Sequence, residues 1–302
     1  MTDYKEHELI GKERYGFDDL LKVMEILRGP GGCAWDAAQT NNSLRRYIIE
    51  ETYEVLDAMD SGVDERIYDE LGDVLLQIVF HAQIAKDEGR FDIEDVTTAI
   101  CKKMISRHAH VFGEVVANTP DEVLDSWEEI KKKEKGLTSH TESIRDVPAS
   151  LPALMRAHKV QHKAAKAGFD WDDIEDVYAK VEEELCEVKE AIADKRDVDA
   201  ESDSESKSEA DNTKVEDEIG DLLFAAVNLA RFANVQPELA LSGTTERFIR
   251  RFELVEKGAT AQGKHLEEMT LAEMDVLWEK AKIELATDAA AACKGKGVPN
   301  EN

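Results

Sequence analysis

Cysteine is scarce in this chain, and its four copies (Cys33, Cys101, Cys186 and Cys293) are widely spaced. They form no C-x-x-C pair and no cluster with histidine, which argues against a zinc site and against a disulfide framework. The longest apolar runs, residues 74–80 and 222–227, are far too short to span a membrane. Residues 1–11 are charged and lack the apolar segment of a secretory signal, so we expect a cytoplasmic protein.

Basic residues are also few for the size of the chain. Lys and Arg together number 38 against 66 Asp and Glu, which gives a net charge of −28. Such an excess of negative charge repels nucleic acids and anionic membranes, so we expect neither as a partner. Nucleotides are not excluded, because a metal ion can stand between protein carboxylates and phosphates.

Apolar residues are present in the amount and with the period of a helical protein. They make up 42% of 302 residues, enough for two domains with a core each. No alternating strand pattern flanked by hairpin turns stands out. Helical periodicity predicts helices at 17–27, 44–59, 65–86, 93–108, around Trp127, at 154–167, 177–193, 215–232, 237–257 and around Trp278. The predicted fold class is all-α.

The second half of the chain repeats the plan of the first. Residues 168–172 (GFDWD) echo residues 33–36 (CAWD), and each motif precedes an acidic helix. Such an internal duplication predicts two tandem helical-bundle domains. We predict an N-terminal repeat at 1–138, a linker at 139–153 and a C-terminal repeat at 154–286. Residues 194–212 contain almost nothing apolar and are expected to form a flexible acidic insert, and residues 287–302 a disordered tail.

One acidic pattern occurs twice, as E-E-x-x-E followed by E-x-x-D. The residues are Glu50, Glu51, Glu54, Glu70 and Asp73 in the first repeat, and Glu183, Glu184, Glu187, Glu218 and Asp221 in the second. Residues three apart share a helix face, so two packed helices would gather four carboxylates. Oxygen clusters of this kind bind Mg²⁺ or Mn²⁺, which in turn bind phosphates.

Acidic pairs are common on solvated helices, but the surroundings of these favour a site. Asp73 and Asp221 each begin a strongly apolar stretch, so we expect both to face a bundle interior. Gly72 and Gly220 stand directly before them. Glycine within a helix costs roughly 1 kcal/mol, which close helix–helix approach would offset.

At these residues the chain resembles the MazG-type nucleoside triphosphate pyrophosphohydrolases of the all-α NTP pyrophosphatase superfamily. The resemblance extends over about residues 17–283. Besides the acidic pattern, it includes GCAWD at 32–36, EETYEVLDA at 50–58, LPALMRA at 151–157, GFDW at 168–171 and GDLLFAAVNLAR at 220–231.

The resemblance implies Mg²⁺-dependent hydrolysis of nucleoside triphosphates to monophosphate and pyrophosphate by a homodimer, for clean-up or regulation of the nucleotide pool. In tandem members the second repeat is credited with catalysis. Carried over, the metal ligands are Glu184, Glu187, Glu218 and Asp221, and the substrate-binding residues are Lys180, Asn228, Arg247, Arg251 and Trp278. Glu183 and Glu184 are both candidates for the general base. Arg247 departs from the family, where lysine is common at this position.

The first repeat is a candidate second site, formed by Glu51, Glu54, Glu70, Asp73, Lys103 and Arg107. It has Tyr47 and Phe80 where the second has Lys180 and Asn228, so it is a weaker site or a structural partner. Alternatives for the whole chain are a narrower activity towards dUTP or phosphoribosyl-ATP, and a non-catalytic helical regulatory partner. On periodicity alone, Trp278 is a core residue.

Overall fold

The computed structural model describes residues 7–114, 119–201 and 209–295 of the chain. Helices make up 76% of it and no strand occurs in those ranges, which confirms the all-α class. The helices are α1 (Phe17–Arg28), α2 (Ala34–Ala38), α3 (Arg45–Ser61), α4 (Asp64–Asp87), α5 (Ile93–Arg107), α6 (Ala109–Phe112), α7 (Pro120–Glu134), α8 (His140–Arg145), α9 (Ala153–Ala165), α10 (Ile174–Glu201), α11 (Glu209–Phe232), α12 (Pro237–Ala261), the 3₁₀ turn η1 (Leu266–Glu268) and α13 (Leu271–Gly295). In the part of the chain so described, no helix combines the length and the apolar character needed to cross a bilayer.

Two compact units divide the chain, Met1–Glu134 and Lys135–Asn302. The predicted linker 139–153 is part of the second unit, because it contains α8 and buries Ser143 and Val147. Its polar residues look like a linker in the sequence but cap a helix in the structure. The Ser139 hydroxyl accepts a hydrogen bond from the backbone N–H of Glu142, whose carboxylate accepts from the N–H of Ser139.

Helices also extend into two segments that the sequence predicted to be irregular. Helix α10 continues to Glu201 and α11 begins at Glu209, so both enter the predicted insert, of which residues 202–208 lie outside the described ranges. Helix α13 continues to Gly295, well into the predicted tail. Alanine is frequent from residue 286 to 292 and is the strongest helix former, which accounts for this extension.

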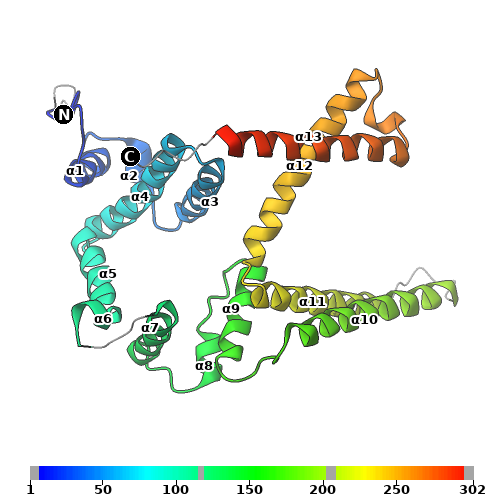
Figure 1. Cartoon of the computed structure of the whole chain (residues 1–302). Helices are drawn as coiled ribbons and strands as arrows, with labels where there is room; N and C mark the ends of the chain where they lie inside the picture. The colour runs from blue at the N-terminus through cyan, green and yellow to red at the C-terminus, as the bar shows by residue number, and fades with distance from the viewer. Residues whose placement is uncertain (1–6, 115–118, 202–208, 296–302) are drawn as a thin grey trace, which may run out of the picture. The chain divides into compact units, whose positions relative to one another are not determined.

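In the first unit, α1, α3 and α4 enclose a core of Met24, Leu44, Val79, Phe80 and Ile84. Helices α3 and α4 lie side by side (Figure 1). The tight turn between them begins at Gly62, whose φ of 64° is left-handed and favours glycine. The unit therefore presents α3 and α4 as an antiparallel pair.

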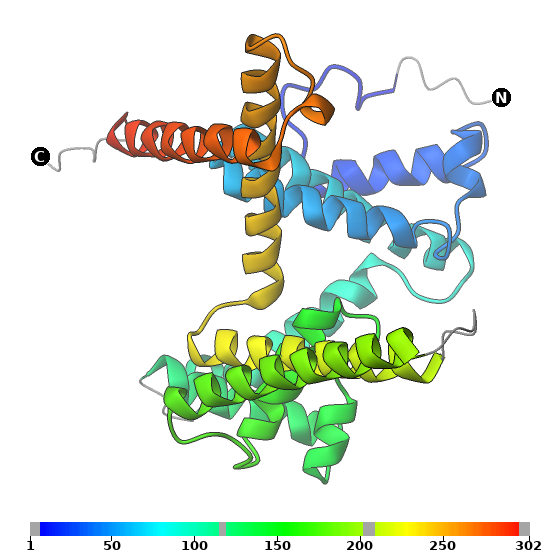
Figure 2. The ribbon, with the colours of Figure 1, turned by 90° about the vertical axis from the view of Figure 1, so that its right-hand side faces the viewer.

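The second unit contains a matching pair, α10 and α11, which lie side by side in both views (Figures 1 and 2). Helix α9 packs on α11, and the Gln161 side-chain amide donates to the carbonyl of Phe224 at 2.8 Å. Helix α12 leads away from this group and crosses α13 (Figure 2). Val255, Ala259, Met269 and Leu277 form the core of that crossing.

Candidate active site

The four predicted metal ligands of the second repeat meet between α10 and α11. Carboxylate oxygens of Glu184, Glu218 and Asp221 all lie within 4.8 Å of one another. Glu187 joins them through a side-chain hydrogen bond with Glu184. Glu184 is buried, Glu218 is half-buried and Asp221 is exposed, so the cluster has one open side.

Negative charge is concentrated at this cluster. The hydrogen bond with Glu184 raises the pKa of Glu187, and burial and the charges of Glu184 and Glu218 raise it further. Even at 4.8 Å, the upper limit of these separations, two unit charges repel by about 3.5 kcal/mol at an effective dielectric of about 20. The arrangement is therefore suited to receive a cation.

Lys180 places a positive charge directly against the cluster. Its Nζ lies 2.7 Å from Glu184 Oε1 and 3.0 Å from Glu183 Oε1. Hydrogen bonds to Glu184 and then Glu183 raise the pKa of Lys180 well above its ordinary value. Both candidate general bases thus accept from the same ammonium group.

The first repeat has the same carboxylates without the ammonium group. Glu51, Glu70 and Asp73 have oxygens within 4.8 Å of one another, and Glu54 shares a hydrogen bond with Glu70. Burial raises the pKa of Glu51 and of Glu70, and neighbouring carboxylates add to the effect. Tyr47 takes the place of Lys180, and its hydroxyl accepts a hydrogen bond from Arg46.

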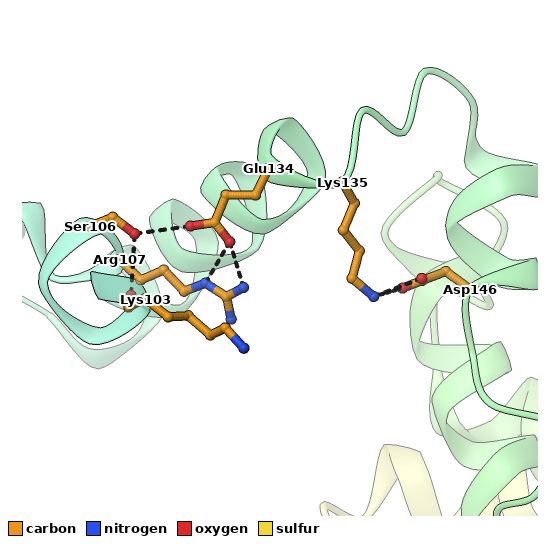
Figure 3. Close-up of polar contacts among 6 residues, drawn as sticks. All are labelled: Lys103, Ser106, Arg107, Glu134, Lys135 and Asp146. Carbon is orange, nitrogen blue, oxygen red and sulfur yellow. Dashed lines mark hydrogen bonds and ion pairs between the residues drawn. The ribbon is translucent and has the colours of Figure 1, made fainter. Parts of the chain in front are cut away.

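Of the two basic residues predicted for the first repeat, Arg107 is paired with Glu134 (Figure 3). Arg107 is buried, and its Nε donates to Glu134 at 3.0 Å while its guanidinium lies 5.1 Å from the Trp127 ring centroid. Hydrogen bonds from Arg107 and Ser106 lower the pKa of Glu134, and the charge of Lys103 adds to this. In this structure the guanidinium is held by Glu134, which lies 27 residues later in the chain.

Three predicted substrate residues of the second repeat lie on α12 and α13. Arg251 is 5.7 Å from the Trp278 ring centroid, and Arg247 donates to Thr244 Oγ1 at 2.6 Å. Trp278 packs against the buried α12–α13 cluster, as its periodicity indicated. Helix α12 leads away from α10 and α11 (Figure 1), and within the described residues no ion pair joins Arg247 or Arg251 to the acidic cluster.

Two interpretations of the acidic helices were wrong. A Cβ atom at Gly72 or Gly220 would meet no heavy atom within 4 Å, so neither glycine serves a close helix approach in this chain. Asp73 and Asp221 are exposed instead of facing an interior. In each repeat the neighbouring helix covers only one side, which leaves the aspartate at the edge of the pair.

Asn228 belongs to a polar network that the sequence did not reveal. Its Oδ1 accepts hydrogen bonds from Arg231 Nε at 3.0 Å and Nη2 at 2.8 Å. Arg231 is also paired through two nitrogens with the carboxylate of Asp170. The spacing from Asn228 to Arg231 is one helical turn and was a usable signal, whereas Asp170 is distant in sequence.

This geometry agrees with comparison to known proteins. The family model described as the MazG nucleotide pyrophosphohydrolase domain matches residues 39–112 and 173–256, once in each repeat. The chain belongs to the MazG family. This membership confirms the predicted family resemblance. It also confirms the prediction that the chain is an enzyme of the class that hydrolyses acid anhydrides.

Several MazG relatives match nearly the whole chain. The nucleoside triphosphate pyrophosphohydrolase/pyrophosphatase MazG of Thermotoga maritima is 45% identical over 266 residues, which cover 88% of this chain and 95% of the relative. The nucleoside triphosphate pyrophosphohydrolase of Escherichia coli K12 is 41% identical over 270 residues, covering 88% and 96%. The uncharacterised protein YabN of Bacillus subtilis is 45% identical over 92% of this chain but only 53% of its own length.

Proposed function

We propose that this MazG-family chain hydrolyses nucleoside triphosphates to nucleoside monophosphate and pyrophosphate, with Mg²⁺ as cofactor and Mn²⁺ as a substitute. The observation that carries the proposal is the convergence of Glu184, Glu218 and Asp221 within 4.8 Å, with Glu187 and Lys180 beside them. The names of the two full-length relatives, both nucleoside triphosphate pyrophosphohydrolases, support the substrate class. The role would be to clean up or regulate the cytoplasmic nucleotide pool.

The donor set fits the proposed cation. It consists of carboxylate oxygens without sulfur or nitrogen, which suits Mg²⁺ and Mn²⁺ and disfavours softer metals. Glu184, Glu187, Glu218 and Asp221 would hold the cation. When bound, a divalent cation offsets phosphate charge and lowers the pKa of coordinated water.

The protein's own groups divide the remaining work. The Lys180 ammonium reaches the same side of the cluster as Glu184, where it can turn from the carboxylates to a phosphate oxygen. Once Lys180 has turned to the phosphate, Glu183, which is exposed, or Glu184 is released to take a proton from an attacking water. The open side of the cluster at Asp221 is where the triphosphate would enter.

The direct test measures pyrophosphate release from a panel of ribo- and deoxyribonucleoside triphosphates, together with phosphoribosyl-ATP. Glu187→Gln and Asp221→Asn should each lower the rate by at least about 100-fold, because each removes a ligand from the cluster. The matched variants Glu54→Gln and Asp73→Asn alter the first repeat. Unchanged rates in the second-repeat variants would refute the assignment, and turnover of one panel member alone would favour the narrower activities.

We also propose that the chain works as a homodimer. Large apolar side chains are exposed on α11, α12 and α13 of the single chain, namely Leu223, Phe224, Leu241, Phe248, Ile249, Phe252, Val276 and Ile283. An exposed apolar surface of this extent is typical of an association surface. A dimer also gives a route by which α12 of a second copy supplies the arginines that one chain keeps away from its own carboxylates.

Mixed dimers test that route. Asp221→Asn and Arg251→Ala chains should each be inactive alone, because one lacks a ligand and the other a phosphate contact. If Arg251 acts on the site of the second copy, co-expression yields one intact site in each mixed dimer and about one quarter of wild-type activity. No recovery, with dimers verified by light scattering, would show that Arg251 does not act across the dimer.

A further inference from the structure

Three residues from two separate segments of the second unit form one hydrogen-bonded chain. Asp170 precedes α10, while Arg231 and Asn228 lie on the last turns of α11. Arg231 is largely buried, with 12% of its side chain exposed, and holds Asp170 on one side and Asn228 on the other. The backbone N–H of Trp171 donates to Asp170 Oδ1 at 3.0 Å and so fixes the carboxylate as well.

The chemistry of the guanidinium decides which way the amide of Asn228 points. A guanidinium only donates hydrogen bonds, so the atom that faces it must be the amide oxygen. Two nitrogens of Arg231 reach Oδ1, at 3.0 and 2.8 Å, and a reversed amide would lose both bonds. The NH₂ group therefore points away from Arg231, and within the described residues it has no recorded partner.

Charge balance indicates the kind of group that this NH₂ would meet. Asp170 offsets the charge of Arg231, so the network offers a neutral donor and no net positive charge. A phosphate would be better served by a cation, whereas a sugar hydroxyl or a base carbonyl suits a neutral amide.

The position on α11 agrees with that choice. Asn228 follows Asp221 by about two helical turns on the same face, which places it about 10 Å further along the axis. With the phosphates at Asp221, the nucleoside part of the substrate would reach Asn228.

The first repeat lacks all three residues. Phe80, Gln83 and Ala34 stand at the positions of Asn228, Arg231 and Asp170. Phe80 is buried in the core, and Gln83 donates to Asp87. There the loop is instead joined to the helices by Arg28, which pairs with Asp87 and donates to the carbonyl of Asp36. An arginine can therefore hold the loop before the acidic helix without an asparagine beside it. In the second repeat the arginine also fixes the orientation of the Asn228 amide, which holding the loop does not require.

We infer that Asp170 and Arg231 are positioning residues that hold the Asn228 amide with its NH₂ group towards a hydrogen-bond acceptor on the nucleoside. The inference rests on the proposed function for the presence of a nucleotide, and concerns which part of it is recognised. The assay therefore measures nucleotide binding separately from pyrophosphate release.

Calorimetry with a nucleotide whose α,β-bridging oxygen is replaced by methylene gives the Kd, and pyrophosphate release gives KM and kcat. Arg231→Met should raise Kd and KM about tenfold and change kcat less than about threefold, because binding of the nucleoside is what weakens. Arg231→Lys should restore part of the affinity. Asn228→Asp keeps an acceptor for Arg231 but loses the donor, so it should raise Kd as much as Arg231→Met does. In the double variant, the fold-increase in Kd should be well below the product of the two single fold-increases.

Nucleotide variants identify the acceptor. If the amide binds a sugar hydroxyl, the rise in Kd caused by Asn228→Asp should vanish for the 3′-deoxynucleotide. If it binds a base carbonyl, the rise should vanish for one base and not for another. A penalty that persists for every sugar and base variant would overturn the inference, because the donor would then not face the nucleoside.

Arg28→Met is the matched control, since Arg28 is an ion-paired arginine with 8% of its side chain exposed in the other repeat. It should lower Tm to a similar extent and leave Kd unchanged. An equal rise in Kd for Arg28→Met, or an unchanged Kd for Arg231→Met, would reduce the network to a structural brace. If wild type binds the analogue but releases no pyrophosphate, the proposed function fails while Kd still tests the network. If wild type binds no nucleotide, both are refuted.

Discussion

Removing one negative charge from the acidic cluster of the second repeat should stabilise the metal-free protein while weakening its response to Mg²⁺. The variant is Asp221→Asn, which keeps the shape of the side chain. Asp221 lies within 4.8 Å of both Glu184 and Glu218, so the substitution removes two repulsive pairs at once. The side chain is exposed, so the change leaves no buried group without a partner.

The expected gain follows from the distances. At 4.8 Å each pair repels by about 3.5 kcal/mol at an effective dielectric of about 20, and by about 0.9 kcal/mol in water. Exposure of Asp221 favours the lower figure, and Lys180 already offsets part of the charge of Glu184. We therefore expect a gain of about 1–2 kcal/mol, or about 3–6 °C in Tm for a unit of this size.

Saturating Mg²⁺ should reverse the order of the two melting temperatures, so that wild type melts higher than Asp221→Asn. A ligand present at 100 times its Kd stabilises the folded state by about 2.7 kcal/mol, and only wild type retains the full set of metal ligands in the second repeat. Scanning calorimetry of both proteins, in EDTA and in Mg²⁺, should show the variant melting higher without metal and lower with it.

Asp73→Asn in the first repeat is the matched comparison. It should stabilise the metal-free protein at least as much, because Tyr47 provides no ammonium group there. Hydrogen exchange along α4 and α11 assigns each effect to its own helix pair. If Asp221→Asn melts lower than wild type in EDTA, or gains as much from Mg²⁺, the repulsive cluster is not the basis of cation binding.

Three smaller predictions concern the two cores and one cap. Met24→Ala should destabilise the first unit by about 2–5 kcal/mol in urea unfolding, since Met24 is 1% exposed. Gly258→Val should cost about 1–3 kcal/mol in the same assay, because even a Cβ atom would lie 2.9 Å from Leu277 Cδ2. The hydrogen bond from Lys264 lowers the pKa of Glu273 to about 2. Its stabilising contribution is therefore complete above the ordinary pKa of 4.5 and is lost as pH falls towards 2, so the Tm difference between wild type and Glu273→Gln should shrink on acidification from about pH 6 to about pH 3.

Long helices could be predicted from the sequence because their apolar residues repeat over several turns. Helices α3, α4 and α11, with the duplicated acidic pattern, are examples, and the carboxylates met as expected. The short helices α2 and α8 were missed because fewer than two turns carry no measurable period. At α8, a capping box decided the structure, and the same residues had indicated a linker.

Pairings between distant residues could not be predicted. The sequence places Arg107 in the candidate second site, but only the fold brings Glu134 and Trp127 around its guanidinium. Asp170 and Arg231 likewise meet across 61 residues. The prediction that Gly72 and Gly220 allow close helix–helix approach was wrong for a related reason. Helix propensity gives the free-energy cost of a glycine but does not show which neighbouring residue, if any, offsets that cost.

The two helix pairs end at different distances from their carboxylates. Helix α3 stops about two turns beyond Glu54 and reverses through Gly62 and Val63, whereas α10 runs about four turns beyond Glu187. The short reversal in the first repeat demonstrates that two residues are enough to connect such helices with their acidic groups in register. The longer connection in the second repeat is therefore not what sets that geometry, because its additional residues begin beyond the turns of α10 that carry the carboxylates.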